Sequence, residues 1–381
     1  MSAELDADVI VLGAGIVGAA CAWRLAQRGL RVRVLEREHA PAAGSTGRSA
    51  AGVRHQFSDE VNVRLSQASI AEYRDMPEAA YRPVGYLFYV PDAMWDEHLR
   101  AVDLQRRLGV PVEVLDLDQA RRRVPADPTG LRGATFCAAD GVVDPHGICM
   151  AYVARARTLG VQFSFSTEVV GISHAADRWR VSSRDGRFAA PLLVNATGAW
   201  AGSIAALAGL RLPVGPARRM VYASGPLDPA LGLPLPCPLT IDLGNGFWFR
   251  SERDRLIFGL ANPEDTGFAE GIDWAWLETA YEAALEHFPW FERLSVDRRA
   301  SWWGYYENTP DHNPVLGRRP DASGWIDACG FSGHGVQQAA AVGRLIAQEA
   351  LGETPFIDVT PLRIARFDGP DPDRSGERLV V

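Results

Sequence analysis

The stretch DVIVLGAGIVGAACAWRLAQRGLRVRVLE, residues 8–36, decides the fold of this chain. Its first five residues form a short apolar run, which is typical of a strand buried on both faces. Helix formers fill residues 16–28, Gly29 suits the end of a helix, and residues 30–36 alternate apolar and polar side chains as a strand does. The order strand, helix, strand within about thirty residues predicts a parallel α/β unit.

Three glycines stand between the first strand and the helix with GxGxxG spacing. Gly13 permits the tight turn, Gly15 lets the main chain approach a pyrophosphate, and Gly18 lets the helix pack close to the sheet. The helix begins at Ile16 and Val17, and the positive end of its dipole faces the phosphates. In this setting the spacing predicts a dinucleotide site.

Glu36 ends the second strand, about twenty residues after the glycines, where a carboxylate can accept hydrogen bonds from a ribose diol. A carboxylate there disfavours the 2′-phosphate of NADP, although Arg37 beside it leaves some room for one. A single strand–helix–strand unit serves NAD as well as FAD. Segments elsewhere in the chain must therefore decide between these two cofactors.

Three later segments favour a cofactor that extends beyond the pyrophosphate: GSTGRSAAGVRHQF at 44–57, VNATGAW at 194–200 and GFSGHGVQQ at 330–338. The last one adds main-chain donors and a second helix N-terminus, which can stabilise negative charge on a reduced flavin. We therefore expect FAD, with its adenosine near Glu36 and its isoalloxazine near residues 333–337. The predicted cofactor contacts are Gly13, Gly15, Ile16, Val17, Gly18, Glu36, Arg37, Ser45, Thr46, Ser49, Ala51, Gly52, Val169, Thr197, Gly198, Trp200, Gly330, Ser332, Gly333, His334, Gly335, Val336 and Gln337.

The composition excludes several other classes of protein. The 381 residues carry a net charge of −8, so no general basic footprint for nucleic acid is present. No apolar run is long enough to span a membrane, and the N-terminus has no signal-peptide pattern. We expect a cytoplasmic protein, with peripheral attachment to a membrane left open. The five cysteines are widely spaced and contain no CxxC, which indicates reduced, mostly buried thiols and neither a disulfide framework nor a metal site.

The pattern of expected helices and strands changes twice along the chain, near residue 84 and near residue 211. This predicts an α/β protein of the two-domain α+β kind. A Rossmann-like FAD-binding domain is interleaved with a mainly antiparallel β-sheet substrate domain. Further helices are expected at 59–75, 92–108, 144–160 and 273–287, and a proline-rich loop at 225–240. The predicted ranges are 1–83, 141–212 and 301–366 for the FAD-binding domain, 84–140 and 213–300 for the substrate domain, and 367–381 for a loose C-terminal tail.

Four segments carry a resemblance to a known family: GSTGRSAAGVRHQFSDEVNVRLS at 44–66, VNATGAWA at 194–201, YYENTPDHNPVLG at 305–317 and GFSGHGVQQAAAVG at 330–343. The chain resembles the FAD-dependent D-amino-acid oxidase superfamily. Within it, the chain is similar to the branch of sarcosine oxidase beta subunits, glycine oxidase, and D-amino-acid or proline dehydrogenases. The resemblance implies FAD, an interleaved two-domain fold, and oxidation of the carbon–nitrogen bond of a small amino acid.

The resemblance also implies roles for individual residues. Arg54 is expected to bind the substrate carboxylate, because a guanidinium can make two parallel charge-assisted hydrogen bonds to it; a surface or flavin-bound arginine is the alternative. His55 could bond substrate or flavin, or be structural. Tyr306 is expected to cover the amine or the carboxylate, and Trp248 to line the substrate, with a plain core role as its alternative. Gln337 is expected to contact both substrate and cofactor.

Three departures from the family pattern refine these expectations. Gly304 stands where some sarcosine oxidases attach flavin to a cysteine, which implies noncovalent FAD. Gln337 replaces a lysine, so a second cationic anchor for a carboxylate is expected to be missing. An apolar residue within RLIFGLA, 255–261, replaces the lysine that assists the reaction with oxygen. This favours a dehydrogenase that passes electrons to a quinone or a protein partner over an oxidase that uses oxygen.

The predicted reaction is therefore hydride transfer from a neutral amino acid, bound at Arg54, to the flavin, followed by hydrolysis of the imine in water. Flavin supplies the chemistry and the protein supplies orientation. An FAD-binding subunit of a hetero-oligomeric amine dehydrogenase, or a regulatory, partner-dependent subunit, is the alternative. A hydroxy-acid or glycerol-phosphate dehydrogenase is a further one. The substrate side chain, its stereochemistry, the electron acceptor and the oligomeric state stay open.

Overall fold

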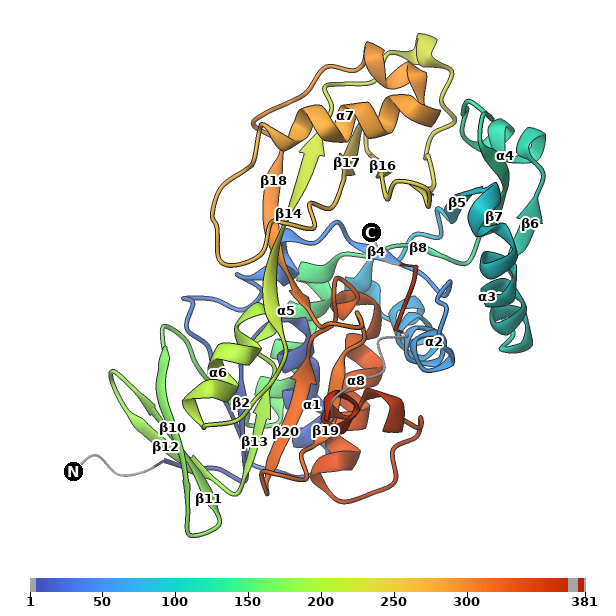
Figure 1. Ribbon diagram of the computed structural model, residues 1–381. Helices are drawn as coiled ribbons and strands as arrows, with labels where there is room; N and C mark the ends of the chain where they lie inside the picture. The colour runs from blue at the N-terminus through green and yellow to red at the C-terminus, as the bar shows by residue number, and fades with distance from the viewer. Residues whose placement is uncertain (1–4, 369–375, 380–381) are drawn as a thin grey trace.

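The computed structural model describes residues 5–368 and 376–379 of the chain. Two units are joined by long strands, as Figure 1 shows. The lower unit in that view is a mostly parallel sheet covered by helices. The upper unit is a mostly antiparallel sheet, with α7 across one part of it and α3 and α4 beside β5, β6 and β7. The predicted fold class, an α/β cofactor unit with an interleaved β-sheet unit, is confirmed.

The parallel sheet has six strands and collects them from the start, middle and end of the chain. All neighbours run parallel except the edge pair β19–β20. The predicted strands at 8–12 and 30–36 are its central pair. In spatial order the strands are β19 (Val315–Arg318), β20 (Trp325–Cys329), β13 (Leu192–Asn195), β2 (Val9–Leu12), β3 (Val32–Leu35) and β9 (Gln162–Ser164).

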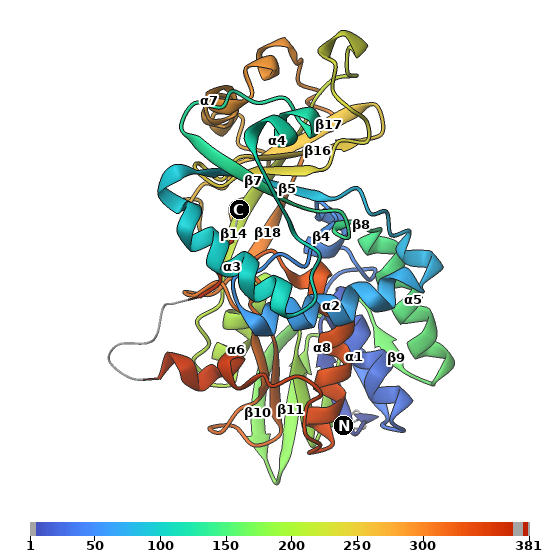
Figure 2. The same ribbon diagram turned by 90° about the vertical axis from the view of Figure 1, so that its right-hand side faces the viewer.

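Helices α1, α5 and α8 cover one face of this sheet, and α2 packs against α8 (Figure 2). The sheet is buried on both faces, which explains why β2 is an uninterrupted apolar run. The helices of the chain are α1 (Ile16–Gln27), α2 (Glu60–Arg74), α3 (Trp95–Arg107), α4 (Leu117–Arg123), α5 (Pro145–Thr158), α6 (Ala201–Leu207), α7 (Trp276–His287) and α8 (Gly335–Ala350).

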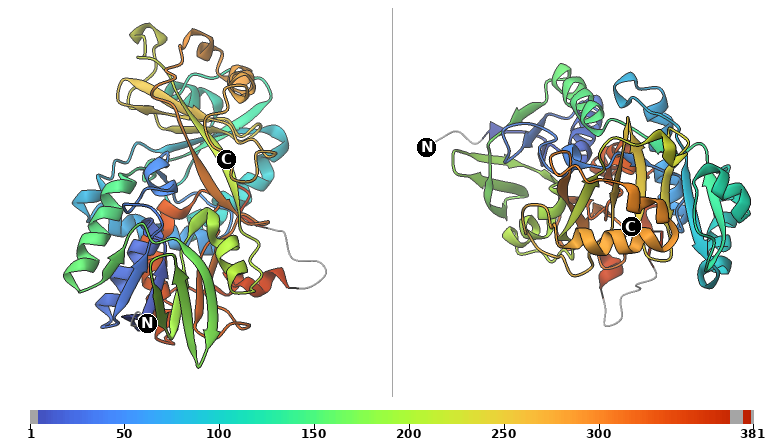
Figure 3. Two further views of the ribbon diagram at one scale, coloured as in Figure 1. Left: turned by 90° about the vertical axis from the view of Figure 1, so that its left-hand side faces the viewer. Right: turned by 90° about the horizontal axis from the view of Figure 1, so that it is seen from above.

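A small four-stranded sheet covers the opposite face and faces the viewer in the left panel of Figure 3. Ile10 and Leu12 of the parallel sheet share a core there with Trp179 and Val181. The sequence analysis assigned no strands to this region and missed the sheet. Its strands are β1 (Leu5–Asp6), β12 (Arg187–Ala190), β11 (Arg178–Ser183) and β10 (Val169–Ala175).

The larger sheet has eight strands, antiparallel except where β15 meets β5. Aromatic side chains, among them Phe247, Phe249 and Phe291, fill the space under α7. In spatial order the strands are β18 (Trp302–Asn308), β14 (Gly215–Ala223), β17 (Arg255–Gly259), β16 (Trp248–Glu252), β15 (Leu239–Asp242), β5 (Tyr86–Pro91), β7 (Leu131–Cys137) and β6 (Glu113–Leu115). A two-stranded ribbon of β4 (Gly52–Val53) and β8 (Gly141–Val142) lies between the units.

Several local expectations can be compared with this fold. Strand β18 falls in the range 301–366, predicted as part of the cofactor unit, yet it pairs with β14 in the larger sheet; the domain ranges stay a prediction. Helix α4 was missed. All five cysteines are buried free thiols, as predicted. Among the described residues, no helix combines the length and the apolar composition needed to cross a bilayer.

The C-terminal tail was expected to be loose. Residues 369–375 and 380–381 of that tail lie outside the described residues. In the described part, 376–379, the expectation is wrong, because Glu377 and Leu379 are buried. The Glu377 carboxylate accepts hydrogen bonds of 3.0 Å from the main-chain amide of Ser58. Residues 376–379 therefore pack at the junction of the two units (Figure 1).

Gly343 of α8 packs tightly against Ala20 of α1. A Cβ atom there would lie 2.8 Å from the main-chain carbonyl carbon of Ala20, which cannot move alone. We expect Gly343→Ala to reduce the free energy of unfolding by about 1–2 kcal/mol, because overpacking exceeds the gain in helix propensity. Thermal or urea unfolding measures the change. Gly215→Ala, where nothing lies within 4 Å, is the control; equal stability of the two variants would contradict the expectation.

Candidate active site

One cavity of about 430 Å³ runs between the two units and collects most of the predicted site residues. Glu36 and Arg37 line one end, and the first turn of α1 lines the middle. The first turn of α8 and strands β14 and β18 line the other end. The cavity therefore joins the two glycine-rich turns of the sequence.

The first turn of α1 has the geometry of a phosphate cradle. Gly13 has φ +97°, which favours glycine, and Gly15 is extended with φ −71° and ψ 179°. The Ile16 amide donates to the Thr46 hydroxyl at 3.0 Å, while the amide of Val17 lies in the first turn and has no carbonyl of its own helix to reach. Gly18 does not line the cavity; a Cβ there would lie 2.1 Å from the Gly13 carbonyl oxygen, so it serves helix packing.

The Glu36 carboxylate is fixed at the end of β3. Its oxygens accept from the amides of Ala14 at 2.7 Å and Glu38 at 2.9 Å, and each oxygen keeps a second lone pair for a hydroxyl donor. The Arg37 guanidinium lies over the Trp200 ring, 3.7 Å from its centroid, and donates to Glu38. This end of the cavity suits ribose hydroxyls better than a phosphate.

The turn before α8 is held open by residues with positive φ. Ser332 has φ 48° and Gly333 has φ +94°, and a Cβ at Gly333 would meet the Tyr306 ring at 2.5 Å. The amide of Gly330 donates to the Glu307 carboxylate at 2.7 Å, so Gly330 lies behind the cavity wall and does not line it. The first-turn amides of α8 have no side-chain cap and face the cavity.

His334 precedes α8 and its ring is buried in the cavity wall. Burial, together with the charge of Arg54, lowers its pKa far below the ordinary range, so the ring is neutral. An arginine can only donate, so the contact of 3.2 Å from Arg54 Nη2 makes His334 Nε2 the acceptor and assigns the proton to Nδ1. That Nδ1 is buried and has no partner among the described residues. An orphaned donor here, beside uncapped helix amides, fits an acceptor-rich ring such as flavin.

Arg54 is buried and lines this end of the cavity, and its guanidinium carbon lies 4.3 Å from the centroid of the Phe57 ring. Its Nη1 donates to the carbonyl of Gln56 and its Nη2 to the carbonyl of Leu379 in the C-terminal segment. Burial lowers its pKa, and the carboxylates of Glu377 and Asp140 act in the opposite direction. The Arg54 guanidinium therefore lines the cavity, and main-chain carbonyls already accept hydrogen bonds from it.

His55 does not line the cavity. Its amide and its ring Nδ1 both lie 2.7 Å from Asp140 Oδ1, and Gln56 donates to the other carboxylate oxygen at 2.9 Å. The Cys137 sulfur completes a buried cluster with these two groups. Because the Asp140 carboxylate is already satisfied, this arrangement favours the structural role of His55 over the catalytic one.

The substrate end of the cavity combines an apolar wall with a few polar groups. Tyr306 and Arg219 lie on its polar side, with Gln337, whose side-chain oxygen accepts from the Arg54 amide at 3.0 Å. The apolar wall is formed by Met220, Leu239, Ile241, Trp248 and Leu260. Every predicted site residue lines the cavity except Gly18, Gly330 and His55.

The sequence analysis missed two charged groups at this end, Arg219 and Glu307. The expectation that a second cationic anchor for a carboxylate is missing stays a prediction, although β14 supplies Arg219 to the lining of the cavity. Two adjacent arginines in a strand point to opposite faces, which is the signal that could have found it. Burial raises the pKa of Glu307 to about 7, and the hydrogen bond from the amide of Gly330 acts in the opposite direction. Nothing in its local sequence distinguishes Glu307.

Comparisons with known proteins agree with this geometry. The model of the FAD-dependent oxidoreductase family matches residues 8–349. The chain is 30% identical over 417 residues to the FAD-dependent oxidoreductase domain-containing protein 1 of Bos taurus, covering 94% of this chain and 84% of that protein. L-proline dehydrogenase from P. horikoshii has a TM-score of 0.84 at 28% identity, covering 96% of this chain and 97% of that one. Glycine oxidase from Geobacillus kaustophilus has the same fold, with a TM-score of 0.81 at 24% identity over 96% of this chain and 100% of that one.

Gly15 tests the phosphate cradle. Its backbone is extended and the nearest atom to a Cβ is the Thr46 hydroxyl at 3.2 Å, so a side chain intrudes on the cofactor more than on the fold. We expect Gly15→Val to retain less than about a tenth of the bound FAD, measured as visible absorbance per protein. Gly171→Val, in an open position of β10, is the control. Full FAD content in Gly15→Val would contradict the cradle.

The Glu307 carboxyl is expected to make the folding stability of the protein depend on pH. Its pKa rises from 4.5 to about 7 on folding, so its contribution is complete below about pH 4.5 and is lost as pH rises through about 7. We expect Glu307→Gln, whose amide oxygen still accepts from Gly330, to gain melting temperature relative to the unsubstituted protein between about pH 5 and 8. The exposed Glu264→Gln controls for loss of charge. If the melting temperatures of Glu307→Gln and the unsubstituted protein change with pH in parallel, Glu307 is not the group responsible for this pH dependence.

Proposed function

This chain belongs to the FAD-dependent oxidoreductase family, and we propose that it oxidises the carbon–nitrogen bond of a small amino acid with noncovalently bound FAD. The observation that carries the proposal is the single cavity that joins a dinucleotide cradle to a half-apolar chamber containing guanidinium groups. A chamber of this kind suits a small organic anion with an apolar portion. The P. horikoshii relative is named as an L-proline dehydrogenase, which supports an amino acid as the substrate.

Noncovalent binding of FAD is supported by the residues around the flavin end. Gly304, on β18, offers no nucleophilic atom, and a Cβ there would lie 3.1 Å from the Arg48 side chain. The main-chain amides at the starts of α1 and α8, the Glu36 carboxylate and the His334 Nδ1 are the donors and acceptors that would hold the cofactor. When bound, FAD supplies the acceptor for a hydride from the carbon next to the amine.

The residues of the chain bind and orient the substrate in this proposal. Tyr306 stays a neutral phenol at ordinary pH, because burial raises its pKa, and it can donate a hydrogen bond to the substrate. Arg54 would exchange the Leu379 carbonyl for the substrate carboxylate. Ile241 and Trp248 exclude water from the reacting carbon. The amine enters in its neutral form, so no strong base is required in the cavity, and the imine product is hydrolysed in water after release.

The electron acceptor is proposed to be a quinone or a protein partner. Leu260 and Ala261 are the residues of the RLIFGLA segment that line the cavity, and neither carries the ammonium group that assists the reaction with oxygen. A dehydrogenase follows from this interpretation.

Anaerobic reduction of the flavin tests the proposed function. We expect one amine from a panel of sarcosine, glycine, L-proline and several D-amino acids to bleach the visible absorption of the FAD-loaded protein, because the cavity suits an amino acid. Glycerol 3-phosphate is the control and should leave the spectrum unchanged. The bleached protein should then reoxidise faster with a soluble quinone than with oxygen.

Two other outcomes would contradict the proposal. Bleaching by glycerol 3-phosphate alone would indicate a dehydrogenase of alcohols. A yellow protein that no amine reduces until a partner subunit is added would indicate a partner-dependent FAD subunit.

A further inference from the structure

We propose that Arg219 is a second anion anchor of the substrate chamber, so that the preferred substrate is an amine that carries two carboxylates. This inference rests on the proposed function and names its substrate class. Arg54 at the floor of the chamber would receive one carboxylate, and Arg219 on β14 the other. Four arginines line the cavity, and the inference starts from two of them, Arg54 and Arg219, because both act on the same Tyr306 hydroxyl.

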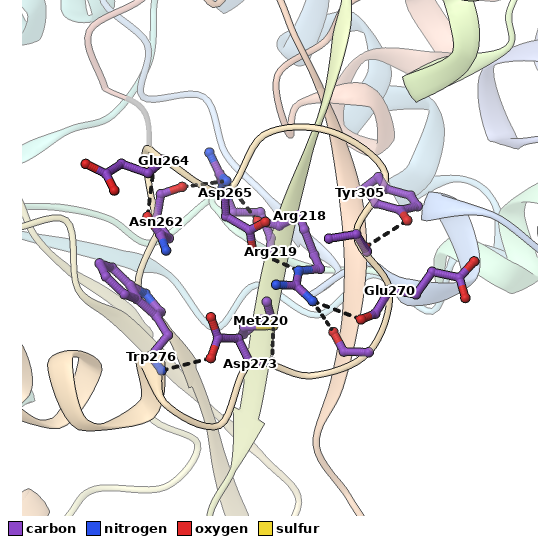
Figure 4. Close-up of polar contacts among 12 residues, drawn as sticks. Arg218, Arg219, Met220, Asn262, Glu264, Asp265, Glu270, Asp273, Trp276 and Tyr305 are labelled. Atoms are coloured by element: carbon purple, nitrogen blue, oxygen red, sulfur yellow. Dashed lines mark hydrogen bonds and ion pairs between the residues drawn. The ribbon is translucent and has the colours of Figure 1, made fainter.

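Strand β14 separates its two adjacent arginines. Arg218 points away from the cavity, where its Nε donates to Asp265 at 2.8 Å and its Nη1 to the carbonyl of Glu270 (Figure 4). Arg219 points to the opposite face, which it shares with Tyr306 of the paired strand β18. Its guanidinium carbon lies 5.3 Å from the centroid of the Tyr306 ring.

Arg219 makes no ion pair within the part of the chain that the structure describes, and burial lowers its pKa. Its Nη1 reaches two main-chain carbonyls, those of Arg218 at 2.9 Å and Asn262 at 3.4 Å. Its Nε is buried and has no partner, and among the described residues no carboxylate lies within ion-pair distance of Arg219. The Asp265 carboxylate is paired with Arg218 and acts on the charge of Arg219 only from beyond ion-pair distance. A buried donor and an unpaired charge beside a cavity favour an anionic ligand.

Arg54 differs from Arg219 in its surroundings. The carboxylates of Glu377 and Asp140 act on its charge, and its Nη2 donates to the Leu379 carbonyl, a group that a ligand oxygen can replace. The charges of Arg219 and Arg54 both act to lower the pKa of Tyr306, so its phenol lies near both guanidinium groups. A ligand with one carboxylate would leave one of the two cations without an anion.

A matched pair of probes tests the second anchor. Succinate and its monoamide succinamate have nearly the same shape, and they differ by one carboxylate. We expect the FAD-loaded oxidised protein to bind succinate about 10–100-fold more tightly than succinamate, the range expected for one charge-assisted pair. Perturbation of the flavin absorption and the rise in melting temperature with ligand both measure the binding.

Three variants locate the effect. Arg219→Met should reduce the preference for succinate to about twofold or less and leave the succinamate affinity unchanged, whereas Arg219→Lys should retain part of the preference. Arg344→Met, which removes an exposed arginine that is stacked on Phe356 and does not line the cavity, is the control and should keep the full preference. FAD content and melting temperature without ligand verify that each variant is folded.

Each contrary outcome overturns the inference. No preference for succinate in the unsubstituted protein, or a preference that survives in Arg219→Met, would exclude Arg219 as an anchor. Equal weakening of both probes by Arg219→Met would make Arg219 the single anchor and exclude a substrate with two carboxylates. These measurements need no turnover. Failure of amino acids to reduce the flavin would contradict the proposed function and leave this result standing.

Discussion

The contact of α1 with α8 is the constraint on which the rest of the structure depends. Both helices follow parallel strands of one sheet, so both begin at the same edge of it. Gly343 against Ala20 lets them pack closely enough for their first turns to meet one cavity. Helix N-termini carry unsatisfied amides and partial positive charge. Two of them at one cavity suit a ligand with a phosphate group at one end and an electron-accepting ring at the other.

The substrate end depends on a different kind of packing, a network of buried polar groups around Arg54. The main chain of Gln56 and Leu379, the ring of His334 and the carboxylate of Glu377 belong to segments far apart in the sequence. Burying a guanidinium is expensive unless its donors are satisfied. The network therefore fixes the position of the Arg54 side chain, and it ties the described C-terminal segment, residues 376–379, to the cavity.

Strand β14 serves two purposes, because neighbouring side chains along a strand point to opposite faces of the sheet. Arg218 fastens the loop that contains Asp265, and Arg219 contributes charge to the chamber. Tyr306, on the paired strand, adds a phenol to the same face as Arg219. The eight-stranded sheet thus forms part of the cavity lining, and the side chains that point into the cavity determine the charge and polarity there.

The sequence by itself determined the cofactor end of this protein. Residues 8–36 contain the whole strand–helix–strand unit, and local spacing is sufficient there because the glycines, the helix start and Glu36 act within one supersecondary element. Only the tertiary structure decided the other end of the cavity: that His55 is held by Asp140, that Leu379 reaches Arg54, and that Arg219 lines the cavity without an ion pair among the described residues. These facts depend on which distant segments become neighbours, and on how burial changes a charge, neither of which a local pattern records.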